Sequence, residues 1–196
     1  MPNPRTLTQD HCECFTRELR VTQGTATQKL RGIRNASLAI LMLETGLRVG
    51  ELCKLRIDDL WYADQPVSTL VVRKEVAKTK QERHIPVSER LALALTEMYT
   101  LIWLDSLNPT KRFAFSAERD DIPLSTRTVQ RIIESAGRDS LHQHVTPHKL
   151  RHTFASRMMR KTNARVVQAL LGHTNLQSTQ IYMHPDAEDL RKAIDS

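Results

Sequence analysis

The sequence predicts a mostly α-helical domain with one small antiparallel β-sheet, an α+β fold. Apolar residues recur at helical spacing in several stretches, and some of these stretches begin at a serine that can cap a helix. One region, residues 55–87, is instead rich in β-branched residues and contains a charged turn. The chain has 196 residues, of which 40% are hydrophobic and 26% charged, so it is long enough and apolar enough to form a globular core.

The polar N-terminal segment, residues 1–28, contains one expected helix, over 8–20. Its start is a poor capping box, because Thr8 is followed three residues later by His11 rather than by Glu or Gln. We therefore interpret residues 1–28 as a lead-in to the domain.

A buried helix is expected over residues 35–44, which are apolar almost throughout. Gly46 follows directly after Thr45, a pattern typical of a glycine C-cap. A short second helix over 49–53 would place apolar side chains on one face.

The β-sheet is expected to follow these helices. Residues 55–61 are strand-like, and residues 68–76 are rich in β-branched side chains. Residues 78–82 form a polar turn and residues 83–87 a returning strand. The sequence thus predicts a hairpin with a charged tip.

The second half of the chain is expected to be helical. Ser88 is expected to cap a helix that extends to about Asp105, and Ser125 to cap a second helix over 126–138. Pro147 lies in the first turn of a third helix. A fourth helix begins near Asn163 and ends at Gly172, and two short helices are expected after it.

Charge points to a polyanionic partner. Lys and Arg total 29 against 22 Asp and Glu, a net charge of +7, and neutralising phosphates releases condensed counterions. The longest apolar run, residues 38–43, is far shorter than the ~20 residues that cross a bilayer, and residues 1–5 lack the apolar stretch of a secretory signal. We expect neither a membrane protein nor a secreted one.

The three cysteines, Cys12, Cys14 and Cys53, predict reduced thiols in a cytosol, because their number is odd and no secretion signal accompanies them. Cys12 and Cys14 are too close in sequence for a typical zinc pair. We interpret all three as incidental to function.

His148 and Arg151 project from one face of the first turn of a helix, three residues apart. An imidazole beside a guanidinium at the positive end of a helix makes a good phosphate receptor. The alternative is that both are solvated residues on a basic helix.

A metal site is the competing interpretation of this region. Four histidines lie within eleven residues: His142, His144, His148 and His152. The last two have the i,i+4 spacing of helical zinc ligands, but no Glu follows His148, and Arg151 between them would repel a cation. We predict no metal.

Four further residues attract attention individually. Arg48 follows a sharp turn, and Glu51, one helical turn later, can hold its guanidinium. His173 lies just past a helix end, and Tyr182 follows nine residues later. Each alone also fits an ordinary ion pair or packing residue.

The combination of these motifs is specific. In chain order come Thr-Gly-Leu-Arg-Val-Gly-Glu-Leu (45–52), a lysine-bearing hairpin, His-Lys-Leu-Arg-His (148–152), Leu-Gly-His (171–173) and Tyr182. This order resembles the tyrosine recombinases, the phage integrase family, over nearly the whole chain from Leu38 to Tyr182.

The resemblance implies a catalytic role for five residues of these motifs. Arg48 matches the first arginine of the family, His148 and Arg151 its His-x-x-Arg box, His173 its second histidine and Tyr182 its nucleophile.

Two further matches are less direct. Glu51 matches a carboxylate that supports the first arginine, and Lys78 matches the catalytic lysine of the hairpin. Lys80 is the alternative lysine, because a shift of two residues keeps the same strand face.

The implied function is that of a site-specific DNA recombinase, which cleaves and rejoins duplex DNA through a 3′-phosphotyrosyl intermediate without a metal ion or other cofactor. Two guanidinium groups can stabilise the negative charge on the phosphate. A phenol with a pKa near 10 must be activated, and His148 could accept its proton. Lys78 could protonate the departing 5′-oxygen, and His173 could donate a hydrogen bond to the phosphate.

We expect residues 1–196 to form a single catalytic domain. Family members commonly carry an N-terminal core-binding domain, whereas here only about 30 residues precede the catalytic pattern, so the chain is either a fragment or a naturally short member. Residues 184–196 form a tail that could dock on a neighbouring protomer or pack on its own domain.

The resemblance also implies the partners. Duplex DNA with a specific recombination site is expected, bound by a homotetramer in the cytoplasm of a prokaryotic cell that hosts the mobile element. No membrane and no small-molecule substrate are expected. The alternatives are a type IB topoisomerase, a non-catalytic DNA-binding regulator and a histidine-metal hydrolase.

Overall fold

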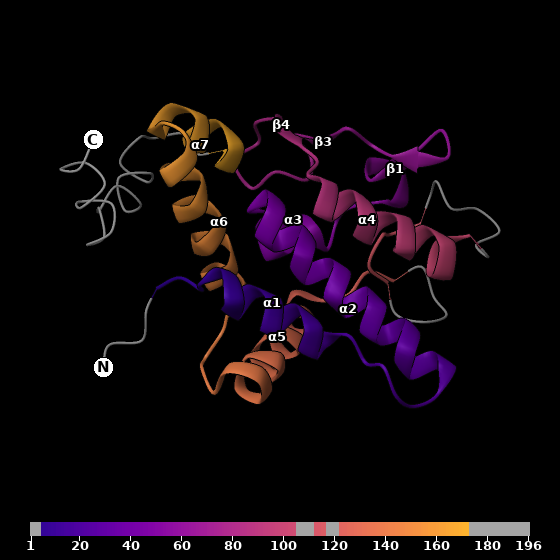
Figure 1. Ribbon diagram of the computed structural model, residues 1–196. Coiled ribbons are helices and arrows are strands. Elements are labelled where there is room, and N and C mark those ends of the chain that lie inside the picture. The colour runs from indigo at the N-terminus through magenta and orange to yellow at the C-terminus, as the bar shows by residue number, and fades with distance from the viewer. Residues whose placement is uncertain (1–4, 105–111, 117–121, 173–196) are drawn as a thin grey trace.

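Helices dominate the computed structural model, which describes residues 5–104, 112–116 and 122–172 (Figure 1). The long helix α2 (Ala26–Thr45) crosses the middle of the molecule, and α1 (Gln9–Leu19) and α5 (Thr126–Leu141) lie along its lower side in Figure 1. Helices α6 (Pro147–Lys161) and α7 (Ala164–Leu171) lie at the left, and α4 (Glu89–Met98) lies at the right. The predicted α+β class is confirmed. Among the described residues, no helix is both long and apolar enough to span a membrane.

The N-terminal segment contains the expected helix, α1, which packs into the fold. Thr8 caps α1 by accepting a hydrogen bond from the His11 amide, although it does not form a capping box. Phe15 and Leu19 on this helix are buried in the main core, and α1 packs against α5 and α2.

Helix α2 begins at Ala26, well before residue 35, where we expected it to start. Thr25 and Gln28 form a capping box: the Thr25 hydroxyl accepts from the Gln28 amide at 3.2 Å, and the Gln28 side chain accepts from the Thr25 amide at 2.8 Å. The first turn is exposed and largely polar, so the sequence there lacks the apolar periodicity that indicates a helix. The expected start was therefore wrong.

Gly46 ends α2 as expected and directs the chain toward the short helix α3 (Val49–Leu52). Its φ of 64° lies in the left-handed region. A Cβ atom at this position would lie 2.4 Å from Cδ1 of Phe154 on α6. The turn can therefore lie directly against α6 only because residue 46 has no side chain.

Gly46→Ala is expected to lower the free energy of unfolding by about 2 kcal/mol or more, because it adds backbone strain to a clash with Phe154. Gly50→Ala is the matched control, since nothing lies within 4 Å of a Cβ built there. Urea unfolding of both variants measures the difference. Equal stabilities would contradict this account of the turn.

The β-structure differs from the single sheet that we expected. Strand β1 (Trp61–Tyr62) pairs with β2 (Gln65–Pro66), and β3 (Thr69–Val72) pairs with β4 (Arg83–Pro86), as two separate antiparallel ribbons.

Two boundaries of the expected strands were also wrong. Residues 57–59 form a 3₁₀ turn, η1 (Ile57–Asp59), rather than a strand. Strand β3 ends at Val72 because the chain then turns, with the amides of Val76 and Ala77 both donating to the carbonyl of Arg73. The β-branched pattern thus extends past the last paired residue.

The helices of the second half begin where we expected them, at the predicted caps Ser88 and Ser125, directly before Pro147 and at Asn163. Ser88, Ser125, Thr146 and Asn163 each accept a hydrogen bond from a backbone amide of the first turn. Helix α4 ends in a π-helical turn, η2 (Tyr99–Trp103), and α5 extends three residues beyond the expected Arg138. The two short helices expected after Gly172 lie outside the described residues.

Packing around α2 positions the site. Helix α2 packs against α4 on one side and α6 on the other, and α7 contacts both α6 and β4. The turn after α2, the start of α6, the end of α7 and the β3–β4 hairpin therefore meet at one end of the molecule.

Candidate active site

Glu51 is the centre of the polar cluster at this end of the molecule. Its side chain is 2% exposed. The carboxylate accepts from the Arg48 amide at 2.9 Å, from Nη1 of Arg48 at 3.3 Å and from the Lys78 amide at 3.3 Å. One carboxylate thus fixes the first predicted arginine and the turn that carries the predicted lysine.

Arg83 is the residue of this cluster that the sequence interpretation missed. Its side chain is buried and donates to both oxygens of Glu51, at 3.2 and 2.6 Å, while its Nε donates to the Leu170 carbonyl at 3.1 Å. Residues 83 and 85 both point inward from β4. A charged residue in register with buried Ile85 was the available signal, because buried charges need a partner.

The pKa of Glu51 reflects this environment. Burial alone raises it, but the hydrogen bonds and charges of Arg83 and Arg48 together outweigh burial and lower the pKa below its ordinary value. Glu51 is therefore a carboxylate in the folded protein.

This shift predicts a pH dependence of stability. Because the folded pKa is lowered, the contribution of Glu51 is complete above its ordinary value of 4.5 and is lost as the pH falls through the folded value. The difference in unfolding free energy between wild type and Glu51→Gln should therefore be constant near pH 7 and shrink below about pH 4.5. Urea unfolding from pH 7 to pH 3 measures it, and a constant difference across that range would contradict the prediction.

Arg151 joins three segments. It is buried, and its Nη1 donates to the Gly46 carbonyl at 2.5 Å while Nη2 donates to the Leu171 carbonyl at 2.9 Å. The first bond joins α6 to the turn that precedes Arg48, and the second joins α6 to the end of α7. Arg48 and Arg151 thus belong to the same polar cluster.

His148 lies exposed on the first turn of α6, with Arg151 one turn later. Partial burial of its ring, and then the charges of Arg151 and Arg48, lower its pKa below the ordinary 6.5. Both guanidinium groups are thus close enough to act on one imidazole. His148 is neutral at pH 7.

Lys78 and Lys80 are both exposed in the turn between β3 and β4. The expectation that they share a strand face was wrong. Neither residue lies in a strand, and Lys80 has a φ of 57°, so the backbone reverses between them. The Lys78 amide is held by Glu51, whereas the Lys80 amide donates to the Ala77 carbonyl.

His173 and Tyr182 lie outside the described residues. Gly172, directly before His173, ends α7 against Arg83, whose Cδ would be 3.0 Å from a Cβ at residue 172.

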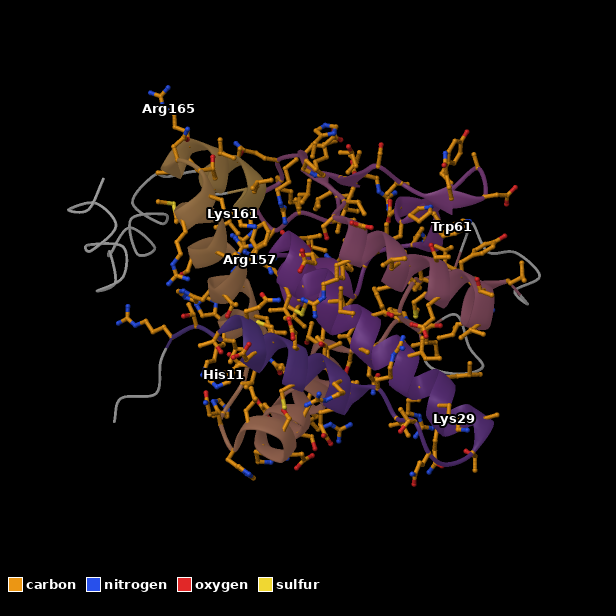
Figure 2. The ribbon with its side chains drawn as sticks, in the orientation of Figure 1. His11, Lys29, Trp61, Arg157, Lys161 and Arg165 are labelled. Atoms are coloured by element: carbon orange, nitrogen blue, oxygen red, sulfur yellow. The ribbon has the colours of Figure 1, made fainter. Side chains whose placement is uncertain are left out.

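The other two tyrosines of the chain lie away from the cluster. Tyr62 is 73% exposed on β1, and the ring of Tyr99 stacks on Trp61 with 4.2 Å between centroids. Trp61 lies in the right part of Figure 2, whereas Arg157 and Lys161 of α6 lie in the left part.

In the described parts of the chain, no group of three or more His, Cys, Asp or Glu is arranged to hold a metal ion. His142 and His144 are exposed, while His152 contacts His148. The three cysteines are free thiols, and burial raises the pKa of Cys53 to about 11.

Comparison with known proteins places the chain in a family. The model of the phage integrase family matches residues 14–189. The tyrosine recombinase XerA of Pyrococcus furiosus is 37% identical over 164 residues, which cover 83% of this chain and 54% of XerA. The chain thus spans about half the length of this relative.

Solved structures of recombinases have the same fold as this chain. The crystal structure of XerA recombinase superimposes with a TM-score of 0.76 at 29% identity, covering 97% of this chain and 64% of that chain. The pre-cleavage complex of the XerH site-specific recombinase with its difH substrate has a TM-score of 0.72 at 22% identity, covering 97% and 53%, and supports the fold alone. Because the family model covers most of the sequence, the chain belongs to the phage integrase family, the tyrosine recombinases.

Proposed function

We propose that this chain is the catalytic domain of a site-specific DNA recombinase that cleaves and rejoins duplex DNA through a covalent 3′-phosphotyrosyl intermediate, without a metal ion. One observation supports this most strongly. Arg48 and Arg151 are both anchored around the turn after α2, and both lower the pKa of His148. Two fixed guanidinium groups beside a neutral imidazole form a receptor for a phosphodiester.

Arg48 and Arg151 stabilise the negative charge that develops on the non-bridging phosphate oxygens. Guanidinium groups remain charged at any physiological pH and bind oxyanions through paired N–H donors. Glu51 orients Arg48, and two backbone carbonyls orient Arg151, so little reorganisation is needed during the reaction. This charge stabilisation requires no metal ion.

Tyr182 attacks the phosphorus atom and forms the covalent ester. The attack makes a bond between the phenol oxygen and phosphorus and breaks the bond to the 5′-oxygen. His148, neutral at pH 7, accepts the phenolic proton, and His173 donates a hydrogen bond to the phosphate. Tyr182 is the remaining tyrosine: Tyr62 lies on β1 and Tyr99 follows α4, elements at the right of Figure 1, whereas α6 and α7 lie at the left.

Lys78 protonates the departing 5′-oxygen. Its side chain is exposed at the tip of the hairpin, and its backbone amide donates a hydrogen bond to Glu51. The side chain can therefore extend toward a DNA strand while the backbone position stays fixed. Because the phosphotyrosyl ester conserves the bond energy, religation by the free 5′-hydroxyl requires no nucleotide cofactor.

The proposed partner is a duplex carrying a specific recombination site, bound by a homotetramer in which residues 184–196 contact the neighbouring protomer. The net charge of +7 favours a polyanionic partner.

The test is capture of the covalent intermediate. The full chain is incubated with nicked duplexes that together cover the DNA flanking its gene, and adducts are resolved on a denaturing gel. Wild type and the control Tyr62→Phe are expected to form an adduct on one duplex, and Tyr182→Phe none. An adduct of undiminished yield with Tyr182→Phe, or none with wild type, would contradict the proposal. Relaxation of a supercoiled plasmid without any preferred site would instead favour a topoisomerase, and binding without an adduct a regulator.

A further inference from the structure

His152 lies one helical turn after His148 on α6, and the two imidazole rings are in contact. The two Nε2 atoms are 2.7 Å apart, which is hydrogen-bonding distance. The ring centroids are 4.3 Å apart, and the ring planes meet at 83°. Neither the matched motifs nor the proposed chemistry assigns a role to His152.

A hydrogen bond between the two Nε2 atoms determines how many protons these two nitrogens carry together. One nitrogen must carry a proton and the other must not, so the neutral pair contains one Nε2–H ring and one Nδ1–H ring. Two imidazolium rings would bring two N–H groups together, so a second proton is strongly disfavoured.

Among the described residues, the side chains whose charges lower the pKa values of the two histidines are positive. Arg151 on α6 acts on both rings, Arg48 in the turn before α3 acts on His148, and Arg5 in the N-terminal segment acts on His152. Burial, and then His148, Arg5 and Arg151, lower the pKa of His152 to about 4. His152 is therefore neutral at pH 7, as an acceptor of a hydrogen bond must be.

We propose that His152 is a positioning residue that accepts a hydrogen bond from Nε2–H of His148 and so directs Nδ1 of His148 toward the reacting phenol. This assignment rests on the proposed function. The proton of Tyr182 then moves to Nδ1 of His148, while Nε2–H stays bonded to His152. The bond strengthens as His148 becomes charged, because a charged donor makes a stronger hydrogen bond than a neutral one.

Nitrogen NMR of the full chain with ¹⁵N-labelled histidine tests the proposal without DNA. Wild type is expected to show a scalar coupling between the two Nε2 atoms and His148 as the Nε2–H tautomer. His152→Gln, whose amide oxygen can still accept, should keep this tautomer. His152→Leu should lose it and lower the pKa of His148 by about one pH unit. His144→Gln, an exposed histidine, is the matched control and should change neither.

Cleavage rates give a second readout. On the nicked duplex that forms the adduct, His152→Leu is expected to cleave about tenfold more slowly with DNA affinity unchanged, and His152→Gln should retain most of the rate. A wild-type His148 in the Nδ1–H tautomer, or equal rates for the leucine and wild-type proteins, would overturn the assignment of His152. Failure of wild type to form any adduct would overturn the proposed function instead, while the NMR result would still decide the hydrogen bond.

Discussion

Glu51→Gln is expected to lower the free energy of unfolding at pH 7 by about 3–5 kcal/mol, the range for removing one partner of a buried ion pair. The reason is the guanidinium of Arg83. It is 4% exposed in its side chain and would remain buried opposite a neutral amide, which can accept from it but cannot balance its charge. Urea unfolding measures the loss.

Two controls separate the loss of this ion pair from the effect on stability of removing any one carboxylate. Glu75→Gln, at an exposed position in the turn after β3, should change stability by less than about 0.5 kcal/mol. The double variant Glu51→Leu, Arg83→Met should recover part of the loss, because it removes both buried charges together. A cost below about 1 kcal/mol for Glu51→Gln would contradict the role of this ion pair.

Arg151→Lys is expected to reduce the single-turnover cleavage rate by about 10²–10³-fold, the range for losing one fixed donor to a developing oxyanion. A lysine ammonium is a point charge and cannot reproduce the fork that reaches both the Gly46 and the Leu171 carbonyls. The charge would be kept, but its position relative to the phosphate would not.

Cleavage of the nicked duplex measures this prediction, with far-UV circular dichroism to confirm folding. Arg160→Lys, at an exposed position on the same helix, is the matched control and should cleave at nearly the wild-type rate. A decrease of less than threefold for Arg151→Lys would contradict the proposed role of Arg151.

Local motifs predicted most of the cluster. Gly46 was predicted as a C-cap because the apolar pattern of α2 stops there, and Arg48 with Glu51 was predicted from their spacing. The resemblance then connected these residues with His148 and Arg151, which lie a hundred residues later in the chain. Their catalytic roles and that of Lys78 remain proposals.

Long-range contacts could not be predicted in the same way. Arg83 is paired with a carboxylate 32 residues earlier, and only the β4 register shows that its side chain points inward. The sequence showed His152 as a possible zinc ligand, because i,i+4 spacing fits either a metal pair or a hydrogen-bonded pair. The start of α2 was missed since a capping box on an exposed turn carries no apolar signal.

Identification of the residue that carries the DNA tests directly whether Tyr182 is the nucleophile. The captured adduct is digested with nuclease and trypsin, and the nucleotide-bearing peptide is sequenced by mass spectrometry. We expect the peptide of residues 166–191, the tryptic peptide that contains Tyr182, with a nucleotide attached to the phenol oxygen through its 3′-phosphate. A nucleotide on Tyr62, Tyr99 or any residue other than Tyr182, or one attached through a 5′-phosphate, would contradict it.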